Sequence, residues 1–378
     1  MKKFIVLWGY GNVGRVVVQD LIQSGHQVWI AWRDKEKIQK FVAELKNEKA
    51  LEEVVDLKNT KELVTIFEKY DCIVNCLEYS LNSVILDTCI EAKRDYVDLG
   101  DSYEWIIASR AKDGKLIESG IRACLGAGSA PGIVNVFVKH IAKKKETVET
   151  LTISFSDEIK NAPEKMLPFN FLTVVEEITG NALLFENGKY SFIKGGSKTM
   201  NIDFCHGFEA KECYLTNSYI TNHDEQFSLP IYLREKGIKN VYFVMKHSDN
   251  VIQLVNSLNE FGFLDTTPMK IKWVEISPFD FCNEVMKQFA PQNFKSDDKE
   301  VLYVKLDETV VGIVNYSVNG VPAWVMNTWI GCSLIAQYFA EHQNTPGVVH
   351  PEDFVDDVWF IEELKKRNFE IYIDNQKI

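Results

Sequence analysis

The chain has 378 residues and a formal net charge of −12, from 42 Lys and Arg against 54 Asp and Glu. Hydrophobic residues make up 46% and charged residues 25%, a composition that excludes a disordered chain and a small disulfide scaffold. The acidic balance argues against a nucleic-acid binder and against docking on anionic lipid, since both need clustered Lys and Arg. At about 100–200 residues per domain, the length suggests two domains, or three.

The N-terminal apolar run, Phe4–Trp8, is too short for a signal peptide, and no stretch reaches the ~18 apolar residues that a membrane helix needs. The eight cysteines are scattered and mostly lie within apolar runs, and no Cys or His pairs follow zinc-site spacing. We therefore expect a cytoplasmic protein with buried thiols, no membrane contact and no metal site.

The first third of the chain alternates between short apolar runs rich in β-forming residues and segments with apolar residues at helical spacing. Repeated strand–helix units of this length predict an α/β fold with a Rossmann-type, doubly wound parallel sheet. The predicted strands are Phe4–Trp8, Gln27–Trp32, Leu51–Asp56, Cys72–Cys76, Tyr96–Leu99 and Arg122–Leu125. The predicted helices are Val13–Ser24, Lys35–Glu44, Thr60–Lys69, Leu81–Ala92, Trp105–Ser119 and Val134–Ala142.

The pattern changes after a joint of small residues, Ala127–Gly132. Beyond it strands become more common than helices, which predicts a second, α+β domain with a mixed sheet. A long amphipathic helix is predicted at Ala323–Glu341. The strands predicted in this part are Leu151–Phe155, Val241–Met245, Lys270–Ile276 and Val301–Lys305.

A GxGxxG sequence follows the first predicted strand and opens the first predicted helix, which is the context of a dinucleotide-binding loop. Gly9 allows a tight turn, Gly11 lets a pyrophosphate approach the backbone, and Gly14 lets helix and strand pack closely. The free N–H groups at the helix start would bind the anion. The alternative is a plain glycine-rich turn. We predict that the cofactor contacts Gly9, Tyr10, Gly11, Asn12, Val13 and Gly14.

The end of the second strand favours NADP over NAD. An NAD site usually has an acid there to hold the ribose hydroxyls, but this strand ends at Trp32 and continues with Arg33. A guanidinium at this position can pair with a 2′-phosphate and stack on adenine. The alternative is that Asp34 binds the ribose, as in an NAD enzyme, while Arg33 points to solvent.

Several segments in this order resemble the saccharopine dehydrogenase-like family, in particular its saccharopine reductase and lysine 6-dehydrogenase branches. The resemblance covers essentially the whole chain. The segments that carry it are Ala31–Arg33, Asn75–Asn82, Val97–Asp101, Ala130–Ile133, Phe261–Asp265 and Ser277–Asp280.

The resemblance implies an oxidoreductase that acts on a C–N bond of an amino acid, a saccharopine- or lysine-like amine, by hydride transfer through an imine. It also implies a substrate domain inserted into the dinucleotide domain. We therefore assign residues 1–132 and 322–378 to the dinucleotide-binding domain, and residues 133–321 to a substrate and dimerisation domain. The chain departs from the saccharopine enzymes in its arginines, because Arg234 is the only one between Gly132 and the C-terminal segment.

Candidate catalytic residues follow two predicted strands, where such sheets bind ligands. Tyr79 matches the family's site tyrosine and could donate or orient a proton, or could simply pack on its loop. Asp98 and Asp101 flank the next strand end and could serve as base or hold the substrate ammonium; the alternative is a turn residue and a cap.

Further cofactor contacts are predicted around the nicotinamide and the ribose, where Asn82 could instead cap a helix and Pro131-Gly132 could be a plain hinge. These predicted cofactor residues are Trp32, Arg33, Asp56, Asn75, Cys76, Leu77, Asn82, Pro131 and Gly132. The resemblance implies substrate contacts at Asn170 and Asn217, which could also be ordinary polar loop residues. Lys246 could neutralise a substrate carboxylate, although a solvated strand end is the favoured alternative.

Two other functions remain open. One is a polyamine enzyme of the carboxynorspermidine or homospermidine type. The other, from a different class, is an NADP-binding redox sensor without turnover, because a fold does not fix a function. The expected partner is a small-molecule amino acid or polyamine substrate, and a homodimer is the expected assembly because symmetric dimers are the commonest oligomers.

Overall fold

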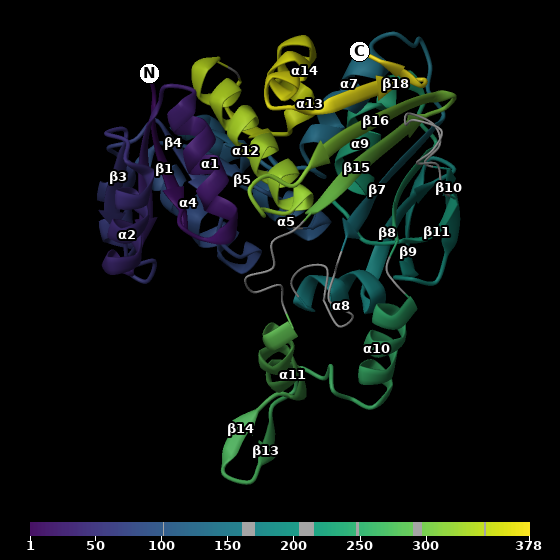
Figure 1. The fold of residues 1–378 in the computed structure, drawn as a ribbon, viewed down its shortest axis with the longest axis horizontal. Helices are drawn as coiled ribbons and strands as arrows, with labels where there is room; N and C mark the ends of the chain where they lie inside the picture. Colours follow the sequence, from purple (N-terminus) through teal and green to yellow (C-terminus); the bar gives the residue numbers. More distant parts are fainter. Residues whose placement is uncertain (101, 161–170, 204–214, 247–248, 290–296, 344) are drawn as a thin grey trace. The chain divides into compact units, whose positions relative to one another are not determined.

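The computed structural model describes residues 1–378 apart from 101, 161–170, 204–214, 247–248, 290–296 and 344 (Figure 1). The chain divides into two compact units. The first unit comprises Met1–Glu146, Ile231–Glu235 and Trp324–Phe369. The second comprises Thr147–Pro230, Lys236–Ala323 and Glu370–Ile378.

The first unit contains a parallel sheet in the order β17-β6-β5-β4-β1-β2-β3. The strand order reverses at β1, which lies between β4 and β2, and ligands of such sheets bind at the carboxyl ends of the strands at this point. The predicted doubly wound sheet is confirmed, and β17 adds a strand that the sequence did not indicate. The strands are β1 (Lys3–Leu7), β2 (Gln27–Trp32), β3 (Ala50–Val54), β4 (Cys72–Asn75), β5 (Asp95–Asp98), β6 (Arg122–Cys124) and β17 (Gly347–Val349).

Side-chain caps begin several helices of this unit. Asp34 and Asn59, for example, each accept a hydrogen bond from a backbone N–H of the helix that follows. The helices are α1 (Asn12–Gln23), α2 (Lys35–Leu45), α3 (Thr60–Phe67), α4 (Asn82–Ala92), α5 (Tyr103–Arg110), α6 (Asp113–Ser119), α7 (Ile133–Ala142), α12 (Ala323–Glu341), α13 (Pro351–Phe354) and α14 (Asp357–Lys366).

Two predictions about these helices are wrong. The single helix predicted at Trp105–Ser119 is two, because the chain turns at Ala111 and Lys112, where the Lys112 N–H donates to the Ser109 carbonyl three residues back. The helix α12 has the predicted bounds but is not amphipathic, since every residue before Glu341 is buried or half-buried. Gly331 allows this burial, because a Cβ there would come within 2.1 Å of the Gly128 carbonyl oxygen.

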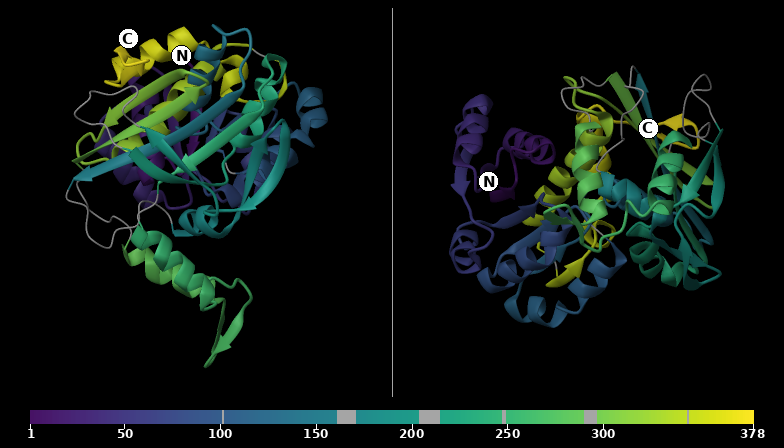
Figure 2. Two further views of the ribbon diagram at one scale, coloured as in Figure 1. Left: turned by 90° about the vertical axis from the view of Figure 1, so that its right-hand side faces the viewer. Right: turned by 90° about the horizontal axis from the view of Figure 1, so that it is seen from below.

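The second unit is built on a mixed sheet in the order β10-β11-β12-β7-β15-β16-β18-β19, with β8 paired to β12 and β9 (Figure 2). The pair β12 and β7 is parallel and its neighbours are antiparallel, so the predicted mixed sheet is confirmed. The strands are β7 (Thr150–Lys160), β8 (Asn181–Glu186), β9 (Lys189–Lys194), β10 (Thr199–Asp203), β11 (Leu215–Ile220), β12 (Asn240–Met245), β15 (Asp297–Leu306), β16 (Thr309–Tyr316), β18 (Glu370–Ile373) and β19 (Gln376–Lys377).

The helices of the second unit are α8 (Phe171–Thr179), α9 (Glu225–Tyr232), α10 (Asp249–Glu260) and α11 (Pro278–Met286). Of these, α8, α10 and α11 share a small apolar core formed by Phe171, Val174, Val255 and Cys282. The prediction of one continuous strand at Lys270–Ile276 is wrong. It is a hairpin of β13 (Met269–Ile271) and β14 (Val274–Ile276), because Lys272 adopts a φ of +57° and turns the chain back. No described helix is both long and apolar enough to cross a membrane.

Candidate functional site

The glycine-rich loop between β1 and α1 forms a cradle that only glycine can build. A Cβ at Gly14 would come within 2.3 Å of the Gly9 Cα and 2.5 Å of the Trp8 carbonyl oxygen. Gly11 is the N-cap of α1 and brings no side chain over the first N–H groups of the helix. These N–H groups and the helix dipole can therefore bind a pyrophosphate. Asn12 and Val13 begin α1, and Tyr10 lies in the loop, where its carbonyl accepts a bond from the Arg15 side chain at 2.9 Å.

Of the two residues after β2, Asp34 caps the next helix and Arg33 lies beside the Trp32 ring. Asp34 caps α2: its carboxylate accepts the Lys37 N–H at 3.1 Å, and this backbone bond lowers the pKa of Asp34. Arg33 is exposed, and its guanidinium carbon lies 5.9 Å from the centre of the Trp32 ring. Asp34, the carboxylate that would hold the ribose of NAD, thus caps α2. Arg33 remains exposed beside Trp32 at the end of the strand, where it can contact a phosphate.

Asp56, also predicted to contact the cofactor, is exposed two residues after β3. Its side chain accepts the Lys58 N–H at 3.0 Å and stabilises a turn.

A chain of buried hydrogen bonds links the carboxyl ends of β4 and β5. The Asn75 amide donates to the Asn82 side chain at 2.8 Å and to the Tyr96 hydroxyl at 3.1 Å. The Tyr96 hydroxyl donates to Asp98 at 3.0 Å. Asn75 also accepts the Leu77 N–H at 3.2 Å, and the neighbouring Cys76 is buried. Two predicted cofactor residues, Asn75 and Asn82, are therefore joined to a predicted catalytic one.

Asp98 is 1% exposed and accepts hydrogen bonds from four groups. These are the Tyr96 hydroxyl, the Trp105 indole N–H at 2.8 Å, and the backbone N–H groups of Gly100 and Gly126 at 3.0 Å each. Burial raises the pKa of Asp98, although these hydrogen bonds act in the opposite direction. The carboxylate thus holds together the segments that follow β5 and β6.

The joint at Pro131 and Gly132 is buried and closely packed. Gly132 has a φ of +133°, and a Cβ there would lie 2.1 Å from the Gly128 carbonyl oxygen, so that only glycine fits. The Gly132 N–H donates to the Asn135 side chain at 2.9 Å, and Asn135 donates to Glu352 at 2.9 Å. These bonds fix the backbone that we expect to face the nicotinamide.

The remaining predicted catalytic and substrate residues come from separate segments of the chain. Tyr79 is half-buried in a one-turn 3-10 helix, Tyr79–Leu81. Lys246 is exposed directly after β12, and Asn217 pairs with Asn201 in the ladder between β11 and β10. Asp101 and Asn170 lie outside the described residues.

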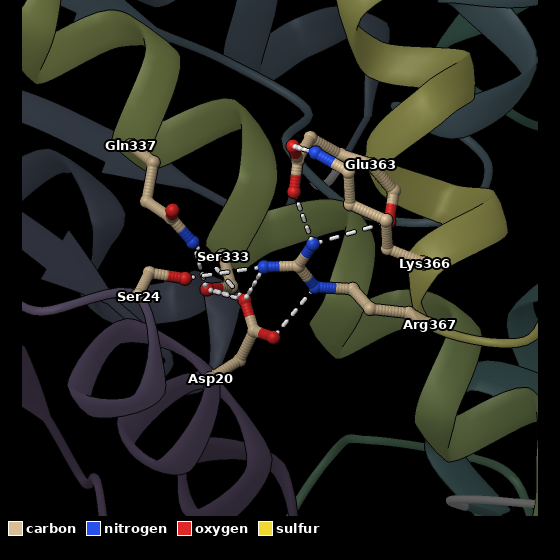
Figure 3. A network of polar contacts seen from close by, with 7 residues as sticks. All are labelled: Asp20, Ser24, Ser333, Gln337, Glu363, Lys366 and Arg367. Carbon is tan, nitrogen blue, oxygen red and sulfur yellow. Dashed lines mark hydrogen bonds and ion pairs between the residues drawn. The ribbon is translucent and has the colours of Figure 1, made fainter.

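The helix α1 is fastened by a buried polar network (Figure 3). Asp20 accepts hydrogen bonds from Ser333 at 2.6 Å and Gln337 at 3.0 Å, both on α12, and forms an ion pair with Arg367 at 2.6 Å. Arg367 also pairs with Glu363 of α14 at 2.7 Å. The helix that carries the anion site is therefore tied to segments more than three hundred residues away in the sequence.

In the second unit, a half-buried histidine and a buried glutamate, both missed in the sequence, form a pair. His223 Nδ1 lies 2.6 Å from Glu225, and the ring stacks on Phe243 with centroids 3.7 Å apart. Burial lowers the pKa of His223, but the carboxylates of Glu225, Asp224 and Glu177 outweigh it and raise the pKa overall. The His-x-Glu spacing was a possible signal, but the sequence did not show that Glu225 is buried and His223 half-buried.

Within the described residues, no group of three His, Cys, Asp or Glu side chains could hold a metal ion. The described cysteines, among them Cys76 and Cys124, are free thiols and buried.

A glycine cradle at the switch point of a parallel sheet, with an arginine after the second strand, defines a dinucleotide-binding domain of the NADP type. Residues 5–123 match the family model of the saccharopine dehydrogenase NADP-binding domain. Residues 128–369 match that of the saccharopine dehydrogenase C-terminal domain. The chain therefore belongs to the saccharopine dehydrogenase family, and it is an NAD(P)-dependent dehydrogenase or reductase with NADP as its cofactor.

Relatives at low identity carry polyamine-related names. Carboxynorspermidine synthase of Vibrio alginolyticus is 25% identical over 293 residues, which are 70% of this chain and 67% of the relative. Carboxyaminopropylagmatine dehydrogenase of Synechocystis sp. is 22% identical over 319 residues, which are 80% and 77% of the two chains. The apo saccharopine dehydrogenase (L-Glu forming) of Saccharomyces cerevisiae has the same fold, with a TM-score of 0.73 over 100% of both chains at 12% identity.

Proposed function

We propose that this protein is an NADP-dependent oxidoreductase that forms or breaks a C–N bond in a polyamine-type amine that carries a carboxylate. The observation that carries the proposal is the charge of the buried groups in the second unit. Among the described residues of this unit, carboxylates outnumber cations at buried positions, and Arg234 is the only arginine in the sequence between Gly132 and the C-terminal segment. The buried charged residues are Glu177, Asp224, Glu225 (paired with His223), Asp298, Lys299 and Glu300. Carboxylates recognise ammonium groups, and a substrate with several carboxylates, such as saccharopine, would call for arginines.

The names of the relatives support the same substrate class. Two of them are synthases or dehydrogenases of carboxylated polyamine derivatives. The lysine- or saccharopine-like amine expected from the sequence is therefore the second candidate, favoured by the resemblance of Val97–Asp101 to the lysine 6-dehydrogenase branch.

The residues of the first unit have separate roles in this proposal. Gly9, Gly11 and Gly14 give the pyrophosphate access to the N–H groups of α1, and Arg33 pairs with the 2′-phosphate. NADP, when bound, supplies or accepts the hydride. Tyr79 and Asp101 handle the proton at the substrate nitrogen. Asp98 acts as a positioning residue, since its oxygens already bind four donors.

The test is oxidation by purified protein with NADP⁺, followed by NADPH absorbance, of carboxynorspermidine, lysine and saccharopine in parallel. We expect turnover with carboxynorspermidine, and we expect Tyr79→Phe to lower kcat about 10²-fold or more while NADPH affinity stays unchanged. Turnover with lysine or saccharopine alone would overturn the polyamine assignment. NADPH binding without turnover on any amine would instead favour a redox sensor.

A further inference from the structure

A cavity of about 180 Å³ lies in the second unit, beside α8, α10 and the connection between β9 and β10. The volume equals roughly six water molecules at about 30 Å³ each, so a small polar group can enter it. Its polar lining consists of Glu177, Lys194, Ser197, Tyr219, Thr221 and Asn256.

The wall of this cavity depends on a glycine. A Cβ at Gly195 would come within 2.6 Å of the Glu177 carbonyl oxygen and 2.8 Å of the Gly180 carbonyl oxygen. Only a residue without a side chain therefore lets the β9–β10 connection pack against the end of α8. This packing brings Lys194, the last residue of β9, to the same cavity as Glu177.

Thr221, one of the lining residues, has a buried hydroxyl without a partner in the described part of the chain. Its side chain is 0% exposed, and among the described residues its hydroxyl has no hydrogen-bond partner. Burying an unpartnered hydroxyl costs free energy, whereas valine would fill the same volume without that cost. Thr221 is one of the residues that line the cavity, and an unpartnered hydroxyl there is suited to bond with a molecule inside it.

The charges indicate which kind of molecule. The residues that line the cavity include an acid, Glu177, which is 7% exposed, and a base, Lys194, which is exposed. A guest with an ammonium and a carboxylate close together would match both. We propose that this cavity binds an amino-acid head group, with its ammonium on Glu177 and Thr221 and its carboxylate on Lys194. The assignment of that head group to the carboxyl-bearing amine substrate rests on the proposed function.

Direct binding to the full chain, measured by calorimetry with NADP present, tests the inference. The probes are L-2,4-diaminobutyrate and 1,3-diaminopropane, which differ only in the carboxylate. We expect the first to bind more tightly and Lys194→Ala to remove that difference. Glu177→Gln should weaken the binding of both probes about tenfold or more, because a charged hydrogen bond is lost.

Thr221→Val gives a second, independent readout. It should weaken binding by several-fold while the melting temperature stays unchanged or rises, since the buried hydroxyl is removed. A purely structural threonine would instead lower the melting temperature and leave affinity alone. The matched control is Glu176→Gln, an exposed neighbour on the same helix, which should change neither quantity.

The outcomes separate this inference from the proposed function. Turnover of carboxynorspermidine with an unchanged KM in Glu177→Gln and Thr221→Val would overturn the cavity site and leave the function standing. Wild-type protein that binds neither probe would also overturn it. Binding that depends on Glu177 without turnover of any amine would support the cavity and overturn the function alone.

Discussion

At the scale of single residues, we propose that Arg33 and Asp34 set the cofactor preference. They are neighbours after β2, yet Asp34 is used as the N-cap of α2 and Arg33 is exposed beside Trp32. Both oxygens of Asp34 contact Lys37, one accepting its backbone N–H and the other lying 3.3 Å from its ammonium. We therefore expect Arg33 to bind the 2′-phosphate of NADP where NAD enzymes present an acid.

We expect Arg33→Ala to weaken NADPH binding about 10–100-fold, because a charge-assisted hydrogen bond to a phosphate is lost, and to leave NADH binding unchanged. Fluorescence titration with both cofactors measures this. The control is Asp34→Ala, which should lower stability slightly through loss of the cap without changing the preference. Equal NADPH affinity in wild type and Arg33→Ala would contradict the assignment.

Asp98 shows what a sequence can and cannot say about a residue. Its position after a strand indicates a site carboxylate, and the structure does put it at the carboxyl end of the sheet. The sequence could not show that Tyr96 and Trp105 donate to it. Tyr96 was within reach of pattern reasoning, because residues two apart on a strand share a face.

At the scale of elements, the network around Asp20 holds α1 in place. Asp20 is 6% exposed and its partner Arg367 is largely buried, so the two charges depend on each other (Figure 3). Asp20→Asn should lower the free energy of unfolding by about 3 kcal/mol, because the Arg367 guanidinium keeps Glu363 but loses its more deeply buried counter-charge. Urea unfolding measures the loss, and NADPH affinity should fall with it, since α1 carries the phosphate site.

Two comparisons make this test specific. Glu44→Gln removes a surface ion pair with Arg15, both about half exposed, and should change stability by no more than about 1 kcal/mol. The double variant Asp20→Leu with Arg367→Met should lose less than the sum of the single changes, because it removes both buried charges together. Additive losses would mean that the pair itself contributes little.

The elements of the parallel sheet were predictable because each strand is a short apolar run and each helix has its own apolar period. The same rules failed where tertiary packing determines where a helix ends or which of its faces are buried. A local pattern did not reveal the break between α5 and α6, and α12 has residues of mixed polarity although the fold buries all its faces. β17 was missed because three residues, Gly347–Val349, are too short to show a period.

At the scale of the whole molecule, the predictable part of the site is the part that is contiguous in sequence. The glycine loop and Arg33 belong to one strand–helix–strand segment. The cavity of the second unit takes Glu177, Lys194, Thr221 and Asn256 from four separate elements and connections, so no spacing along the chain could reveal it. The requirement for glycine at position 195 could not be predicted either, because it comes from the Glu177 and Gly180 carbonyls at the end of α8.

The pH dependence of stability is also a property of the whole chain, and His350 contributes to it in a known direction. Burial and the nearby Arg110 lower the pKa of His350 to about 3, whereas the pKa of an unperturbed histidine is 6.5. Between these two values the unfolded chain binds a proton that the folded chain does not. Unfolding therefore takes up a proton, and stability is lost as the pH falls from about 6.5 towards 3.

The slope from this one group is about 1.4 kcal/mol per pH unit. His350→Gln should remove it, so that lowering the pH from about 7.5 to about 5.5 costs the variant roughly 1 kcal/mol less than the wild type. Urea unfolding at the two pH values measures the difference. His342→Gln, at an exposed histidine, should keep the wild-type dependence. If both variants track the wild type, His350 is protonated equally in the folded and unfolded chains, and the burial that keeps its ring neutral is not effective.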